Sequence, residues 1–164
     1  VNKIPFLGIC LGMQMAVIEY ARNVKKIRYA NSTEISEKCK DPVIDLMTSQ
    51  KEIINKGGTM RLGAWDCEIE KNTKSYKCYK KKLISERHRH RYEFNNSYSD
   101  RIFDDKFIVA GSNPDTKLVE IVENIDHPWF VGVQFHPEYK SSVYNPHPIF
   151  VNFVKASLKK YLNK

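Results

Sequence analysis

A short apolar run that ends at a glycine-flanked cysteine, with a helical repeat directly after it, constrains this chain more than any other feature. Residues 4–9 (IPFLGI) have the pattern of a buried strand. The next residues, 11–22, carry apolar side chains at helical spacing, at Leu11, Met15, Ile18 and Ala21. Strand, tight turn and helix in succession are typical of an α/β architecture, so we expect a mainly parallel central sheet.

Other segments predict the rest of that sheet and a closing helix. We expect strands at residues 59–62, 64–69, 92–94, 107–110, 118–122 and 129–135. Residues 118–122 alternate apolar and polar, which predicts one solvated face, whereas residues 129–135 (WFVGVQF) predict a central buried strand. The last helix should span residues 148–162, with a buried stripe at Ile149, Phe150, Phe153, Val154 and Leu158. Residues 28–58 are polar and irregular.

Size and composition favour a single intracellular domain. The 164 residues are 41% apolar, enough for one core, and no apolar run is long enough to cross a membrane. The four cysteines are scattered, and neither they nor the histidines have zinc spacing, so we predict no metal site. A reducing, cytoplasmic setting is therefore expected.

The chain is basic, with a formal net charge of +8 from 27 basic and 19 acidic residues. Much of the excess lies in residues 71–82 and 155–164. Such runs are usually solvated faces, so we predict neither a nucleic-acid nor a membrane partner. A basic binding module without catalytic activity stays open as an alternative, because Tyr76 and Tyr79 lie among the basic residues.

The cysteine at the strand–helix junction is a candidate nucleophile. In Gly8-Ile9-Cys10-Leu11-Gly12 a tight turn would expose Cys10, and glycines would let the backbone segments approach closely. The helix N-terminus would favour the thiolate, and the Leu11 N–H could donate to an oxyanion. The motif alone fits a buried structural cysteine equally well.

A histidine–carboxylate pair follows the most apolar strand. His136 could take the thiol proton, and Glu138, two residues further on, could orient the imidazole. The position after a buried strand favours a Cys–His–Glu triad over a surface pair. His88 and His90 are weaker candidates, because the arginines around them should lower their basicity.

These motifs resemble the class I (triad) glutamine amidotransferases, and further segments narrow the resemblance to the CTP synthase family. The segments that carry it are residues 8–14 (GICLGMQ), 30–34 (ANSTE), 57–63 (GGTMRLG), 86–93 (ERHRHRYE), 118–120 (LVE), 127–130 (HPWF) and 134–138 (QFHPE). Residues 57–63 and 87–93 are specific to that branch, whereas the cysteine and histidine motifs are shared with its relatives.

The resemblance implies a role for each site residue. Cys10 would be the nucleophile, His136 the base and Glu138 its orienter, and L-glutamine would be held by Leu11, Gln14, Glu34 and Arg91. A paired cation and anion suit an amino acid, because Arg91 can bind its carboxylate and Glu34 its ammonium. Without the resemblance, an exposed loop carboxylate and a surface base would be the simpler interpretations of Glu34 and Arg91.

The resemblance also implies partners beyond residues 1–164. The implied fold is a flavodoxin-like class I amidotransferase domain whose N-terminal part, with a second oxyanion donor, is missing, as is the synthetase domain. That domain would bind UTP, ATP and Mg²⁺ and aminate UTP to CTP with the ammonia. A GTP activator and a homotetramer are implied too, with no cofactor in the glutaminase part. The segment 46–57 is shorter than the family's loop, and residues 1–164 alone could be inactive.

One nearby alternative is another triad amidotransferase or a γ-glutamyl hydrolase. The segments 57–63 and 87–93 argue against it.

Overall fold

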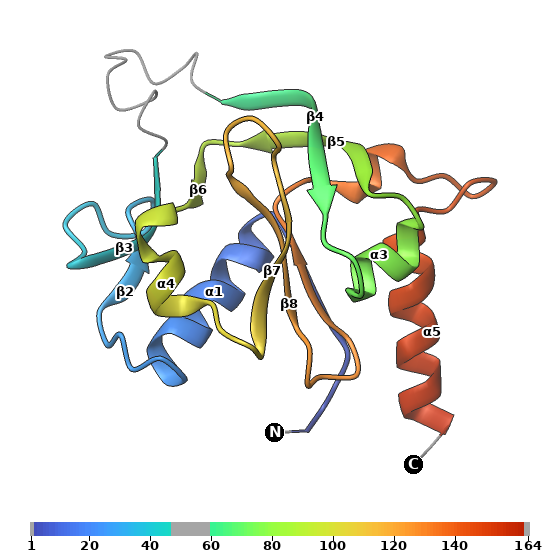
Figure 1. Ribbon diagram of the computed structural model, residues 1–164, viewed down its shortest axis with the longest axis horizontal. Helices are drawn as coiled ribbons and strands as arrows, with labels where there is room; N and C mark the ends of the chain where they lie inside the picture. Colours follow the sequence, from blue (N-terminus) through green and yellow to red (C-terminus); the bar gives the residue numbers. More distant parts are fainter. Residues whose placement is uncertain (1, 47–59, 163–164) are drawn as a thin grey trace.

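Two sheets hold the strands in the computed structural model, which describes residues 2–46 and 60–162 (Figure 1). The larger has six strands in the order β1-β9-β8-β7-β4-β5, and the smaller has the order β2-β3-β6. The strands are β1 (Phe6–Ile9), β2 (Ala30–Ser32), β3 (Asp41–Leu46), β4 (Arg61–Ile69), β5 (Leu83–His90), β6 (Tyr92–Phe94), β7 (Phe107–Ser112), β8 (Val119–Asn124) and β9 (Phe130–Val133).

Helices cover both faces of the larger sheet. They are α1 (Leu11–Asn23), α3 (Lys74–Tyr79), α4 (Ser99–Ile102) and α5 (Pro148–Leu162), with short 3-10 helices η2 (Asn96–Tyr98) and η3 (Pro137–Lys140). One core cluster joins α1 to the smaller sheet through Met13, Val17 and Ile44. The other lies under α5 and contains Ile121, Val133 and Ile149. Ile121 packs into the second cluster, and its neighbour in β8, Val122, packs into the first. This arrangement is expected for a strand that is buried on both faces.

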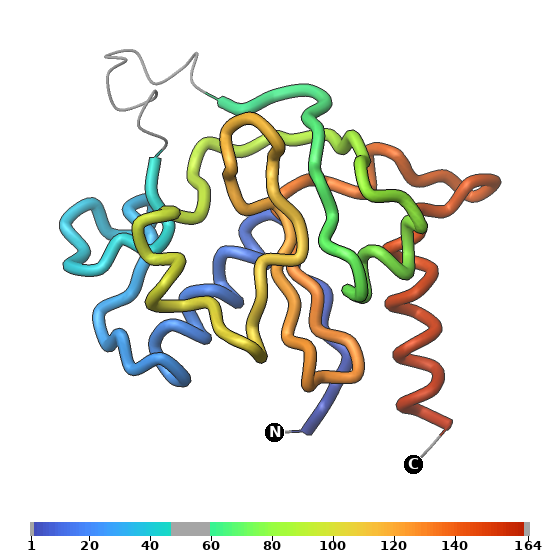
Figure 2. The backbone as a smooth tube through the Cα atoms, viewed as in Figure 1, coloured from blue at the N-terminus to red at the C-terminus, as the bar shows by residue number. Residues whose placement is uncertain are grey.

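The described sheet is mixed, whereas we expected a mainly parallel one. Within it β1 and β9 are parallel, and the pairs β9–β8, β8–β7, β7–β4 and β4–β5 are antiparallel. Short connections explain this, since β7 leads directly into β8 and β8 into β9, and such hairpins force antiparallel pairing. Figure 2 traces the β7–β8 hairpin beside the chain of β1 and β9.

Several predicted elements need correction. Residues 28–46 are not irregular, because they include β2 and β3, which pair in parallel. The strands expected at 59–62 and 64–69 are one strand, β4, with residue 59 outside the described part. The strand β5 was not predicted at all. Its charged sequence hides a period of two, with Glu86, His88 and His90 buried and the arginines between them exposed.

The predicted solvated face of β8 is wrong. Glu120 and Glu123 are both fully buried. The Glu123 carboxylate accepts from the N–H groups of Lys74 and Ser75 at 2.8 and 2.7 Å, at the N-terminus of α3. It also accepts from the Ser75 hydroxyl at 2.6 Å. These partners lie about fifty residues away along the chain and satisfy the buried charge.

The last helix begins and ends where predicted, but its buried stripe is narrower. Ile149 is buried and Phe150 and Phe153 are half-buried, whereas Val154 and Leu158 are 53% and 54% exposed. The helix packs through its first half, where Ile149 and Phe153 join the core cluster. Among the described residues no helix combines the length and apolarity needed to cross a membrane.

Candidate active site

Cys10 lies at a strained turn between β1 and α1. Its φ of 51° and ψ of −107° are unusual for a residue with a side chain. A Cβ on Gly8 would lie 2.7 Å from the Gly12 carbonyl carbon and oxygen, so only glycine fits there. Gly12 has no such restriction, because a Cβ there would meet nothing within 4 Å. The prediction that glycine is needed on both sides of the turn is therefore wrong for Gly12.

The Cys10 thiol is less acidic than the helix N-terminus suggested. Burial raises its pKa, and the charges of Glu34 and Glu138 raise it further. Hydrogen bonds from the Leu11 N–H and from the Gln134 side chain lower it, but they do not outweigh burial. A thiol of this kind needs a base to become a nucleophile.

His136 and Glu138 form a short hydrogen bond just beyond the end of β9. The His136 Nδ1 lies 2.6 Å from the Glu138 carboxylate, so Nδ1 carries the proton. The backbone N–H of His136 donates to the Arg87 carbonyl at 2.8 Å. The Tyr139 ring stacks on the imidazole, with 5.2 Å between the ring centroids. The Nε2 of His136 is buried and has no hydrogen-bond partner among the described residues. This arrangement leaves Nε2 available to accept a proton.

The pairing of β1 with β9 brings the cysteine and histidine segments to one edge of the sheet. Ile9 lies opposite Val133, and the Cys10 N–H donates to the Val133 carbonyl at 2.7 Å. His136 follows Val133 by three residues. The rise that the Glu138 charge causes in the Cys10 pKa is a consequence of the same proximity.

One cavity of about 450 Å³ gathers the other predicted site residues. Cys10 lines it together with the four predicted glutamine contacts, Leu11, Gln14, Glu34 and Arg91. Two buried polar atoms of this group, Gln14 Oε1 and Arg91 Nε, have no hydrogen-bond partner in the described part of the chain. His136 and Glu138 do not line the cavity. The predicted glutamine contacts and the candidate nucleophile therefore share one cavity.

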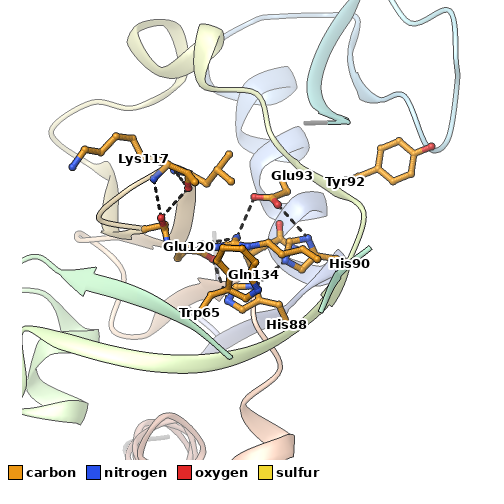
Figure 3. Close-up of polar contacts among 12 residues, drawn as sticks. Trp65, His88, His90, Tyr92, Glu93, Lys117, Glu120 and Gln134 are labelled. Carbon is orange, nitrogen blue, oxygen red and sulfur yellow. Dashed lines mark hydrogen bonds and ion pairs between the residues drawn. The ribbon is translucent and has the colours of Figure 1, made fainter. Parts of the chain in front are cut away.

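A buried polar cluster that the sequence did not predict adjoins this cavity. The guanidinium of Arg61, from β4, lies 2.7 Å from Glu120 and 3.3 Å from Glu93. The rings of His88 and His90, from β5, lie 2.8 Å apart between Nδ1 and Nε2. Figure 3 shows the side chains of His88, His90, Glu93 and Glu120 converging, while the Tyr92 ring points away from them.

The pKa values of the ionisable groups in this cluster are strongly shifted. The pKa values of His88 and His90 fall to about 2 and about 3, first because of burial and then because of Arg61. The sequence predicted this fall in histidine basicity, but the cation that contributes to it is Arg61 of β4 rather than a neighbouring arginine. Burial raises the pKa of Glu93 and of Glu120 to about 7, against the opposing attraction of Arg61. Both histidines are thus neutral and unsuited to act as bases for Cys10.

The remaining histidines are occupied elsewhere. His147 lies 3.0 Å from Glu86 and accepts from the Ile149 N–H at 3.3 Å, beneath the start of α5. The backbone N–H of Trp129 donates to the Nδ1 of His127 at 3.2 Å.

Comparisons with known proteins show the family to which the chain belongs. The family model of glutamine amidotransferase class-I matches residues 1–156. CTP synthases from Flavobacterium johnsoniae and Christiangramia forsetii are 62% and 61% identical over 96% and 95% of the chain. The chain spans 29% of the length of each of these curated relatives.

Solved structures agree as well. The Trypanosoma brucei CTPS glutaminase domain with bound acivicin is 38% identical, with a TM-score of 0.89 over 96% of this chain and 61% of that one. A Thermoplasma acidophilum protein described as a GMP synthase subunit is 19% identical and has a TM-score of 0.59 over 98% of this chain and 61% of that one. This second likeness shows the fold alone. The predicted α/β amidotransferase fold and the resemblance to CTP synthases are confirmed.

Proposed function

The chain belongs to the class-I glutamine amidotransferase family, and we propose that it hydrolyses L-glutamine with Cys10 as nucleophile, His136 as base and Glu138 as orienter. The cavity shared by Cys10 and the predicted glutamine contacts is the observation that carries this proposal. It is supported by the His136 Nε2, which has no partner among the described residues and sits on the segment beside the elbow.

The first half of the reaction forms a thioester. The Cys10 sulfur attacks the carbon of the glutamine side-chain amide, while the thiol proton moves to His136 Nε2. Glu138 stabilises the imidazolium through Nδ1, and the Leu11 N–H donates to the oxyanion. His136 then returns the proton to the departing nitrogen as the carbon–nitrogen bond breaks, which releases ammonia.

The second half regenerates the thiol. His136 takes a proton from water, and the hydroxide attacks the thioester carbon. The carbon–sulfur bond then breaks, glutamate leaves and the sulfur regains its proton from His136. No cofactor is required for either half.

The cavity residues are suited to an amino acid. We propose that Arg91 binds the α-carboxylate, because its buried Nε has no partner in the described chain and a guanidinium fork fits a carboxylate. Glu34 and the Gln14 Oε1 would accept from the α-ammonium. These contacts would fix the side-chain amide over Cys10, as an attack geometry requires.

The identity with CTP synthases supports a wider role for the whole polypeptide. We propose that the ammonia aminates UTP to CTP in an ATP- and Mg²⁺-dependent synthetase domain beyond these residues, with GTP as an activator and a homotetrameric assembly. A cytoplasmic location stays a prediction, and the four unpaired cysteines are compatible with it.

The test is to assay the intact polypeptide with Cys10→Ala. We expect glutamine-dependent CTP formation to be abolished and ammonia-dependent formation to persist, because only the first needs the thiol. Loss of both activities, or retention of both, would contradict the division of labour. If ammonia is released but UTP is not its acceptor, the chain serves another triad amidotransferase or a γ-glutamyl hydrolase.

A further inference from the structure

The register of β1 against β9 places one more polar side chain beside the nucleophile. Ile9 pairs with Val133 in a parallel ladder, so the next residues along each strand, Cys10 and Gln134, lie at the same level. The Gln134 N–H donates to the Glu120 carbonyl at 2.8 Å, which ties its backbone to β8. The Gln134 side chain is fully buried, and its Nε2 lies 3.7 Å from the Cys10 sulfur.

Neighbouring groups fix which end of this amide faces the sulfur. The Tyr92 carbonyl can only accept, so the group of Gln14 that lies 2.8 Å from it is its Nε2. The same Nε2 lies 3.3 Å from the Gln134 amide, which must therefore present its Oε1 there. The Nε2 of Gln134 is left to face Cys10. The orientation thus follows from a chain of partners that begins at a backbone carbonyl, beside the predicted substrate ligand Arg91.

The electrostatics of the site indicate a role for the contact between Gln134 and Cys10. Burial and two nearby carboxylates, Glu34 and Glu138, work against the thiolate of Cys10. The groups that work for it are the Leu11 N–H and the Gln134 amide. An amide donor is neutral at every relevant pH, so it can stabilise the sulfur anion without competing with His136 for the proton.

We propose that Gln134 is a further catalytic residue, which donates its Nε2–H to the Cys10 sulfur and stabilises the attacking thiolate. The inference rests on the proposed function in one respect, the role of Cys10 as nucleophile. The alternative is a structural role, in which Gln134 only fills the space between the two strands. That role would leave the acidity of the thiol unchanged.

The experiment measures the pH dependence of Cys10 alkylation by iodoacetamide in the intact polypeptide, with each cysteine followed by mass spectrometry of its peptide. The variants are Gln134→Met, which removes the donor at similar length, and Gln134→Glu, which places an oxygen in its position. Cys39 is the control, because it lies on the loop between β2 and β3 and does not line the cavity of Cys10. The fully buried Cys67 reports folding, since it stays unlabelled only while the sheet is intact.

We expect the alkylation midpoint of Cys10 to rise by about one pKa unit in Gln134→Met, since a hydrogen bond to a charged group is lost. At a fixed pH below the midpoint, labelling would then be about tenfold slower. The rise should be larger in Gln134→Glu, and the Cys39 midpoint should not move. The kcat for glutamine should fall with the thiolate fraction, with little change in KM.

Two variants with the wild-type Cys10 midpoint and protected Cys67 would overturn the inference. If one variant exposes Cys67, the other decides the matter alone. Failure of the proposed function would look different. In that case the Cys10→Ala protein would keep glutamine-dependent activity, whatever the alkylation midpoints of the Gln134 variants.

Discussion

Two histidine–glutamate pairs in this molecule have similar hydrogen bonds and opposite surroundings. The His136–Glu138 pair spans 2.6 Å, and its side chains are 18% and 46% exposed. The His147–Glu86 pair spans 3.0 Å, and its side chains are 3% and 4% exposed. In the first, Nδ1 donates to the carboxylate and Nε2 has no partner among the described residues. In the second, Nδ1 accepts from the Ile149 N–H, so Nε2 must donate to Glu86.

The difference separates the proposed base from a structural link. His147 has both ring nitrogens occupied, and the Tyr79 hydroxyl donates to the same Glu86 oxygen at 2.9 Å. It therefore has no lone pair for an incoming proton and serves to join α3, β5 and the start of α5. His136 binds Glu138 through Nδ1 and leaves Nε2 without a partner among the described residues, as a base requires. A histidine beside a carboxylate is thus informative only when its second nitrogen is accounted for.

The largest effect expected from this comparison is on catalysis. His136→Asn should lower the kcat for glutamine hydrolysis by about 10³- to 10⁴-fold, because the thiol of Cys10 loses its base. Ammonia-dependent CTP formation by the intact polypeptide is the internal control and should not change. A loss of less than about tenfold would mean that another group deprotonates Cys10.

A smaller catalytic effect is expected at the orienting carboxylate. Glu138→Gln should lower the kcat by about 10²-fold, since the amide no longer stabilises the imidazolium. The loss should be smaller than for the base itself, because Glu138 is half exposed and water can take over part of its role. Steady-state kinetics that give equal losses for the two variants would contradict this ranking.

The buried pair should respond in stability rather than in chemistry. His147→Phe should lower the free energy of unfolding by about 2 kcal/mol, because Glu86 and Tyr79 lose a buried partner. The kcat per folded molecule should stay within about twofold of the wild type. Denaturant unfolding followed by kinetics on the folded fraction checks both, and a large fall in kcat with unchanged stability would reverse the assignment.

The cluster around Arg61 should give a pH dependence of stability. Glu93 and Glu120 have folded pKa values of about 7, above the ordinary value of 4.5. The folded state therefore holds more protons than the unfolded state between these values, and stability falls as the pH rises from about 4.5 to 7. The difference of about 2.5 pKa units corresponds to a loss of at most about 3 kcal/mol per carboxyl. Glu120→Gln should flatten this part of the unfolding profile, and an unchanged slope would contradict the assignment.

The comparison also explains which parts of the molecule the sequence could predict. The elbow and the segment 134–138 are local signals, because strand, turn and helix follow one another and the histidine comes directly after a buried strand. The fold of β1, α1, β9 and α5 was therefore within reach, whereas Glu34 and Arg91 of the cavity were predicted from the family resemblance alone.

The burial of the polar residues in β5 could not be predicted from the sequence. His88 and Glu86 are buried because their partners, Glu120 and His147, arrive from distant elements, and no local pattern encodes such pairing. The alternation of buried residues with exposed Arg87 and Arg89 was the one available signal. The acidity of Cys10 was mispredicted for a similar reason, since burial depends on the whole assembly.

In the proposed function, Cys10 is the nucleophile of a glutamine site. The most direct measurement treats the intact polypeptide with a diazo ketone that carries the α-amino and α-carboxylate groups of glutamine, and maps the adducts on the four cysteines of residues 1–164 by mass spectrometry. We expect an adduct on Cys10 alone, suppressed by L-glutamine and slowed by His136→Asn. Equal labelling of all four cysteines, or labelling of Cys10 that glutamine does not suppress, would contradict it.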